Sequence, residues 1–121
     1  MQAVAKYMIL IFGDEQQWSA MSAAEQQKVD EGHLAFQAAA GAARLTGAQL
    51  QPAPMATSLR ADATGRVTTT DGPFLETKEA LGGYYLVEAD DLDQVIALAS
   101  KLHEVYAGHS GVEIRPVVDH G

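Results

Sequence analysis

The chain alternates between two hydrophobic periods, and each change of period predicts an element. Lys6–Phe12 is a short apolar run that a glycine and two acidic residues end, which predicts a buried strand. Both sets of alternate positions in this run are apolar, so both faces of the sheet need cover at this strand. Residues 83–89 predict a second central strand of the same two-faced kind.

Two stretches carry the longer period of a helix, each behind a capping residue. The S-A-A-E box that begins at Ser22 predicts a helix running to about Arg44, with His33 on its apolar face. Asp91 caps a second helix predicted to extend to Tyr106. The apolar positions are Val29, Phe36, Ala40 and Ala43 in the first helix, and Leu92, Val95, Ile96, Ala99, Leu102 and Tyr106 in the second.

Turn-forming residues divide the remaining sequence into shorter strands. Residues 48–50 predict a short strand before two prolines, and residues 56–61 and 66–70 predict a hairpin joined through an Ala-Thr-Gly turn. Residues 112–118 alternate in polarity and predict a final strand. Pro116 lacks a backbone donor, so this strand is expected at a sheet edge.

The order of these elements predicts an α+β domain. Strand, helix, strand, hairpin, strand, helix and strand together form a ferredoxin-like split βαβ arrangement with an inserted β-hairpin, and residues 1–121 are expected to form one such domain. Two helices cover only one face of a sheet, whereas the central strands are apolar on both faces. The second face is therefore expected to be buried against another copy of the chain, in a face-to-face homodimer.

Composition and charge narrow the function classes. The chain has 121 residues, 47% of them hydrophobic, which suffices for one core without disulfides or a structural metal. Sixteen acidic against eight basic residues give a formal net charge of −8, which disfavours contact with nucleic acid and with anionic membranes. There is no cysteine, so thiolate catalysis and cysteine-ligated metals are excluded. Without a signal-like or membrane-spanning segment, we expect a soluble cytoplasmic protein.

Residues 71–85 carry the densest motif, DGPFLETKEALGGYY. The D-G-P start is typical of a turn, because Asp bonds nearby backbone amides, Gly accepts any dihedral and Pro fixes φ. Phe74 is expected to anchor this turn in apolar surroundings. The two glycines at 82–83 precede a strand and not a helix, which argues against a phosphate loop and favours a close backbone approach.

Three segments in this order resemble the YCII-related, or DGPF-domain, family: KYMILIFGDE at 6–15, DGPFLETKEALGGYYL at 71–86 and VEIRPV at 112–117. The resemblance implies a ferredoxin-like α+β fold that pairs into a dimeric α/β barrel. It also implies suspected enzymatic activity, because family members carry a helix histidine and an aspartate in a cleft, and distant relatives include a muconolactone dehalogenase. Family members are often encoded beside extracytoplasmic-function sigma factors, which implies a regulatory link.

His33 resembles the helix histidine of that family and is a candidate general acid or base, since imidazole exchanges protons near neutral pH. The alternative is a histidine at the edge of the core. The cleft aspartate of the family has no clear counterpart here, so Asp71 of the DGPF motif is the substitute. An aspartate before a glycine is equally typical of a tight turn.

Four further residues are candidates for substrate binding. Lys78 and Arg115 suit an anionic substrate, although neighbouring glutamates make surface ion pairs the alternative. Phe74 offers an aromatic surface, and Tyr84 or its neighbour Tyr85 offers a phenol, although aromatics on a central strand are also typical of a core or an interface. The four histidines show no paired ligand spacing, so neither a metal nor a cofactor is expected.

These observations leave two functions of different classes. The first is a dimeric small-molecule enzyme that performs proton transfer or elimination, with His33 as acid or base and Asp71 beside it. The alternative is a non-catalytic ligand sensor or regulatory accessory protein associated with a sigma factor; a purely structural dimer is a third possibility. Geometry distinguishes them, because catalysis needs His33 and a carboxylate to converge on a concave pocket.

Overall fold

A computed structural model describes residues 4–120 of the chain, so the ends of the predicted domain, residues 1–3 and Gly121, lie outside the described residues. Strands and helices are both present, and both sheets are antiparallel, which confirms the α+β class. The elements are β1 (Ala5–Gly13), α1 (Glu15–Ser19), α2 (Ala23–Ala40), β2 (Arg44–Gln49), β3 (Thr57–Ala61), β4 (Val67–Asp71), β5 (Ala80–Ala89), α3 (Leu92–Ala99) and β6 (Ser110–Pro116). Short 3-10 turns are η1 (Gly41–Ala43), η2 (Ala53–Met55) and η3 (His103–Val105).

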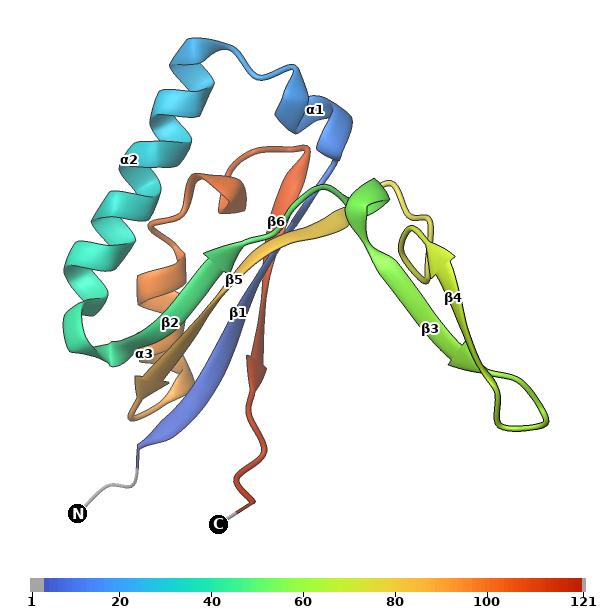
Figure 1. Cartoon of the computed structure of the whole chain (residues 1–121). Coiled ribbons are helices and arrows are strands. Elements are labelled where there is room, and N and C mark those ends of the chain that lie inside the picture. The colour runs from blue at the N-terminus through green and yellow to red at the C-terminus, as the bar shows by residue number, and fades with distance from the viewer. Residues whose placement is uncertain (1–3, 121) are drawn as a thin grey trace.

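Four strands form the main sheet in the order β2-β5-β1-β6. The two apolar strands predicted to be central, β1 and β5, pair with each other in the middle of this sheet, with Ile9 opposite Tyr85. On its other side Ile9 lies opposite Ile114 of β6, which is an edge strand, as Pro116 predicted. The hairpin β3-β4 forms a separate two-stranded sheet that extends away from the helices and the main sheet (Figure 1).

The core lies between one face of the main sheet and the helices α2 and α3 (Figure 1). Ile9 and Val87 from the sheet are fully buried with Phe36 of α2 and Val95 of α3. The opposite set of alternate side chains on β1 and β5 is only half-buried: Met8, Leu10, Phe12, Tyr84 and Leu86. The two-faced character of the central strands is thus confirmed, while the homodimer inferred from it stays a prediction.

The first long helix ends earlier than predicted. α2 begins behind Ser22, whose Oγ accepts the backbone N–H of Glu25 at 3.1 Å, as the capping box predicted. It ends at Ala40 and not at Arg44, because Gly41 adopts φ +52°, a conformation that favours glycine and breaks the helical ladder. Arg44 instead begins β2, opposite Val87, so the strand predicted at residues 48–50 starts four residues earlier.

The second helix is also shorter than its hydrophobic period indicated. α3 ends at Ala99, where the Ser100 hydroxyl donates to the Ile96 carbonyl at 2.7 Å and the next N–H groups bond to carbonyls three residues back. Leu102 remains fully buried beyond the helix, whereas Tyr106 is 70% exposed. The segment after α3 therefore folds as the tight turn η3, which lies beside α2.

The hairpin and the turn after it agree with the predictions from the sequence, with one exception. The carboxylate of Asp62 accepts the N–H groups of Thr64 and Arg66 at 2.9 and 3.1 Å, which closes the predicted turn between β3 and β4. Gly72 adopts φ +100°, a backbone conformation that glycine tolerates without strain. The prediction that Phe74 anchors the turn in apolar surroundings is wrong. Phe74 is 58% exposed, and Cζ of Arg60 lies 4.6 Å from the centroid of its ring.

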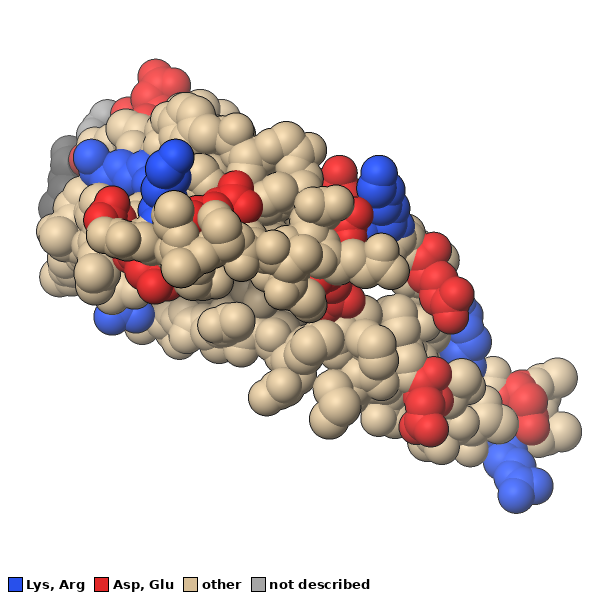
Figure 2. Space-filling model, turned by 90° about the horizontal axis from the view of Figure 1, so that it is seen from above, with Lys and Arg blue, Asp and Glu red and all other residues tan. Residues whose placement is uncertain are grey.

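The surface carries both signs of charge. On the face shown in Figure 2, the Lys and Arg side chains are few and are scattered among Asp and Glu side chains. Within residues 4–120, no helix combines the length and the apolar character that crossing a membrane requires.

Candidate functional site

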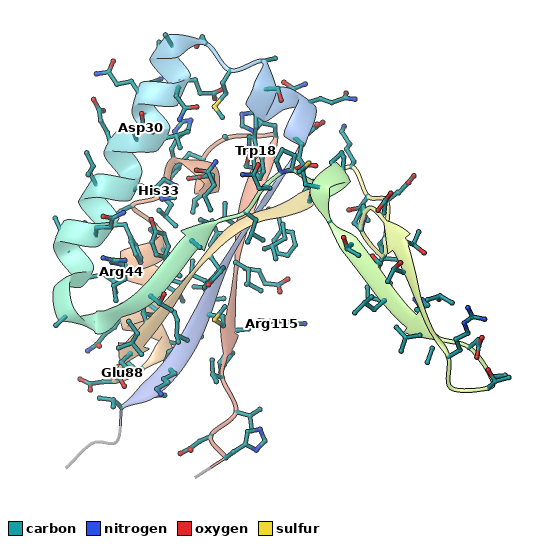
Figure 3. The ribbon with its side chains drawn as sticks, viewed as in Figure 1. Trp18, Asp30, His33, Arg44, Glu88 and Arg115 are labelled. Atoms are coloured by element: carbon teal, nitrogen blue, oxygen red, sulfur yellow. The ribbon has the colours of Figure 1, made fainter. Side chains whose placement is uncertain are left out.

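A cleft of about 870 Å³ opens between α2 and the main sheet. Its walls come from α1 and α2 on one side, β2 and β5 on the other, and η3 at the base. Trp18, Asp30, His33 and Arg44 surround this space in Figure 3. The volume falls within the range typical of small-molecule sites, and the lining mixes apolar and titratable side chains.

His33 projects from α2 into this cleft and contacts two polar groups. Its Nε2 lies 2.8 Å from Oε2 of Glu104, and its Nδ1 lies 2.7 Å from the hydroxyl of Tyr85. Gln37, one helical turn after His33, donates from Nε2 to the same hydroxyl at 3.4 Å. The His33 side chain is 24% exposed and that of Glu104 is 10% exposed. A histidine oriented by a buried carboxylate is the arrangement that general acid–base catalysis uses.

Gly32 allows the close packing that brings His33 to Glu104. A Cβ at this position would lie 2.9 Å from both the backbone carbonyl of Lys101 and the backbone nitrogen of His103. Only a residue without a side chain lets α2 approach the η3 segment so closely. Glu104 is buried within that segment, and its Oε1 has no hydrogen-bond partner among the described residues.

Tyr85 is held in place by the neighbouring strand and by the core. A Cβ at Gly47 of β2 would lie 2.5 Å from the Tyr85 ring, so the glycine leaves the space that the ring occupies. The other side of the ring packs on Phe36, with centroids 4.3 Å apart. The phenol oxygen thus has a fixed position beside His33.

A second polar cluster lies at the α1 end of the cleft. Trp18 donates from Nε1 to the Ser110 hydroxyl at 2.8 Å, and Nδ1 of His109 lies 2.7 Å from the same oxygen. The indole covers Gly82, where a Cβ would lie 2.4 Å from the ring. At Gly83 a Cβ would lie 3.0 Å from the backbone carbonyl oxygen of Ala48 in β2, which is the close backbone approach predicted at this glycine pair. Nε2 of His109 lies 3.4 Å from the carboxylate of Glu25.

Glu25 is therefore shared by two histidines. Nε2 of His103 also lies 3.4 Å from Glu25 Oε2. The hydrogen bond from His103 is the largest cause of a lowered pKa at Glu25, below the ordinary 4.5, and His109 adds to the effect. The carboxylate links the first turn of α2 to the segment between α3 and β6.

These histidines and carboxylates do not form a metal site. Among residues 4–120, no group of three or more His, Asp or Glu side chains is arranged to hold a metal ion.

Comparison with known proteins places the chain in a family. A model of the YCII-related domain matches residues 5–120. The chain belongs to the YCII-related family. It is also 35% identical over 113 residues to an uncharacterized protein, R00369, of Rhizobium meliloti (strain 1021), an alignment that covers 92% of this chain and 90% of that protein. The resemblance read from the DGPF and strand motifs is thereby confirmed.

In this YCII-related chain, His33 and Asp71 do not meet. Asp71 is the exposed last residue of β4, opposite Thr57 in the projecting hairpin, and is not among the residues that line the cleft. Both ring nitrogens of His33 instead face Glu104 and Tyr85. The pairing of His33 with Asp71 expected from the motif is wrong, because the turn after β4 folds away from α2.

The predicted substrate-binding residues are also dispersed. Lys78 borders a smaller pocket of about 320 Å³ next to α1, and Phe74 lies beneath Arg60. Arg115 pairs with Glu113 at 3.1 Å through exposed side chains of β6, which is the surface ion pair expected as the alternative. Tyr84 borders the cleft, but its side chain belongs to the sheet face opposite that of Tyr85.

Two functional candidates have no counterpart in the sequence predictions. Glu104 lies in a segment that was predicted to be helical, and its position between His103 and Val105 gave no signal of a functional role. Arg44 was assigned to the end of the first helix, whereas among residues 4–120 it is the one Lys or Arg that lines the cleft. Its location depends on the helix end at Gly41, which releases Arg44 into β2.

Proposed function

We propose that this YCII-related protein is a small-molecule enzyme in which His33 and Glu104 perform proton transfer. The observation that carries the proposal is the 2.8 Å contact between His33 Nε2 and the buried Glu104 carboxylate, at the wall of an 870 Å³ cleft. A carboxylate at this distance fixes the ring orientation and stabilises the imidazolium that forms when His33 accepts a proton. Glu104 takes the role that was predicted for Asp71.

We also propose that Arg44 binds an anionic group of the substrate. Arg44 lines the cleft and makes no ion pair with the carboxylates of the described residues. It begins β2 opposite Val87, two residues along β5 from Tyr85 and on the same face of the strand. A guanidinium there can bind a carboxylate or phosphate in a bidentate manner while the reacting part of the molecule lies beside His33.

The assembly proposed with this site is a homodimer of ferredoxin-like domains, paired as a dimeric α/β barrel. The strand order β2-β5-β1-β6 and the half-buried apolar side chains on the helix-free face of β1 and β5 support it. Leu10→Glu introduces a charge into that face. Light scattering should then report a monomer mass for the variant and a dimer mass for the unaltered chain; a monomer in both samples contradicts the dimer.

The test of the enzymatic function is a metabolite screen followed by turnover assays. Trp18 is the one tryptophan of the chain and lines the cleft, so its fluorescence reports binding there and complements thermal shift. Compounds that bind are then incubated with the unaltered protein and with His33→Asn and Glu104→Gln. Loss of conversion by at least about 100-fold in both variants supports proton transfer by this pair. Binding without conversion by the unaltered protein contradicts it and favours a ligand sensor.

A further inference from the structure

Both ring nitrogens of His33 contact protein groups, namely Tyr85 and Glu104. Neither nitrogen is left for a substrate, so the group that contacts the substrate lies next to His33. An ionised Glu104 carboxylate only accepts hydrogen bonds, and Nε2 at 2.8 Å must therefore carry the proton. In a neutral imidazole the other nitrogen, Nδ1, is then an acceptor. In this neutral tautomer the Tyr85 hydroxyl, 2.7 Å from Nδ1, donates its hydrogen to His33.

The phenol oxygen of Tyr85 retains room for one further partner. It donates to His33 Nδ1 and accepts a long hydrogen bond of 3.4 Å from Gln37 Nε2. One lone pair of this oxygen has no hydrogen-bond partner among the described residues, and Tyr85, although only 8% exposed, lines the cleft. A ligand at this point must present a donor: an O–H, an N–H or an acidic C–H.

We infer that Tyr85 is the catalytic residue that exchanges a proton with the substrate, and that His33 and Glu104 act through it as positioning residues. In the step, the Tyr85 hydroxyl hydrogen passes to His33 Nδ1 while the phenol oxygen takes a proton from the substrate. The products are a substrate anion and an imidazolium that Glu104 stabilises, so protons and charge balance. The substrate class is a molecule with an acidic hydrogen, such as one on the carbon next to a carbonyl. This inference rests on the proposed proton-transfer function.

The arrangement of the core supports this division of roles. The Tyr85 ring packs on Phe36, and Gly47 leaves the space that the ring occupies because it has no Cβ. This packing keeps the phenol oxygen beside His33. Catalytic groups gain from such a rigid location, because the reacting atoms then need no rearrangement during the step. Tyr106 is the natural comparison, since it is 70% exposed and its hydroxyl donates to the Ser100 carbonyl, away from His33.

A sulfonyl fluoride tests the inference without a known substrate. When the Tyr85 oxygen attacks the sulfur of phenylmethanesulfonyl fluoride, an O–S bond forms, the S–F bond breaks with release of fluoride, and the phenol proton passes to His33. The intact chain is labelled first and then digested. Peptide mass spectrometry should find Tyr85 labelled at least about tenfold faster than Tyr106. His33→Asn and Glu104→Gln should each reduce the Tyr85 rate to that of Tyr106.

Each other outcome has a defined meaning. Labelling of His33 in place of Tyr85 overturns the inference and leaves the proposed proton-transfer cleft intact, because His33 then faces the reagent directly. A Tyr85 rate equal to or lower than that of Tyr106 overturns it as well. Nitrogen-15 NMR gives a second measure: His33 should show the tautomer with hydrogen on Nε2, and hydrogen on Nδ1 contradicts the direction of the Tyr85 hydrogen bond.

Discussion

His33 Nε2 and Glu104 Oε2 lie 2.8 Å apart although 71 residues separate them in the chain. The contact joins the middle of α2 to the turn η3, and it depends on the close approach of these segments at Gly32. The pair is part-buried, so water competes less for its hydrogen bond than it does at the surface. Its strength should therefore differ measurably from that of an exposed pair.

A double-mutant cycle measures that difference. His33→Ala, Glu104→Ala and the double variant should give a coupling energy of about 1.5–3 kcal/mol in the free energy of unfolding, as expected for a hydrogen bond to a charged group. The matched control is Arg115 with Glu113, a 3.1 Å pair whose side chains are 72% and 52% exposed. This pair should couple by less than about 1 kcal/mol. Equal coupling energies from urea denaturation would show that burial adds nothing to the His33 contact.

Gly32→Ala should destabilise the protein, against the usual effect of this substitution in a helix. Helix propensity alone favours alanine by about 1 kcal/mol. Here the new Cβ would lie 2.9 Å from two backbone atoms of residues 101 and 103, which cannot move as a flexible side chain can. Overpacking of this kind costs about 1–3 kcal/mol, so the melting temperature should fall.

Gly108→Ala is the control for Gly32→Ala, because a Cβ at Gly108 meets no atom within 4 Å and its φ is not positive. Its unfolding free energy should stay within about 0.5 kcal/mol of that of the unaltered chain. A Gly32→Ala variant as stable as Gly108→Ala would mean that α2 can shift away from η3 at no cost.

The sequence predicted the parts of this fold that local patterns specify. Residues 6–12 and 83–89 were predicted as two-faced central strands because alternation and burial act on neighbouring positions, and the structure pairs them as β1 and β5. Ser22 and Asp91 were predicted as helix caps for an equally local reason, and their side chains accept backbone N–H groups as expected.

The acid partner of His33 could not be predicted in this way. The period of α3 continues to Leu102 and Tyr106, so the sequence gives no sign that the helix ends at Ala99 and that a turn brings Glu104 to His33. The contact is a consequence of tertiary packing at Gly32. Asp71, in contrast, was assigned to the site because the DGPF motif is distinctive in sequence. In the structure Asp71 ends β4 on the projecting hairpin.

The shared carboxylate of Glu25 should make stability depend on pH. Hydrogen bonding from His103, and next from His109, lowers the pKa of Glu25 below 4.5 in the folded protein. A folded-state pKa below the unfolded value means that Glu25 stabilises the fold above pH 4.5 and that this contribution is lost as pH falls through the lowered pKa.

Glu25→Gln should therefore lower the free energy of unfolding at neutral pH, and the difference from the unaltered chain should shrink as the pH falls below 4.5. Urea denaturation at a series of pH values measures the effect. Glu113→Gln is a suitable control, since the exposed Glu113 side chain on β6 pairs with Arg115 and with neither of these histidines. A difference between Glu25→Gln and the unaltered chain that stays constant with pH would contradict the assignment.

Arg44→Met should separate the binding of anionic ligands from binding to the cleft in general. Methionine keeps much of the apolar stem but removes the charged fork, so a carboxylate ligand loses a charge-assisted hydrogen bond of about 1.5–3 kcal/mol, equivalent to about 10–150-fold in Kd. Trp18 fluorescence titrations with each carboxylic acid that binds the unaltered chain, and with its uncharged amide, give the two affinities. The acid should weaken and the amide should not. Arg115→Met, outside the cleft on β6, should change neither, and an equal loss for acid and amide would assign Arg44 a shape-determining role in place of an anion-binding one.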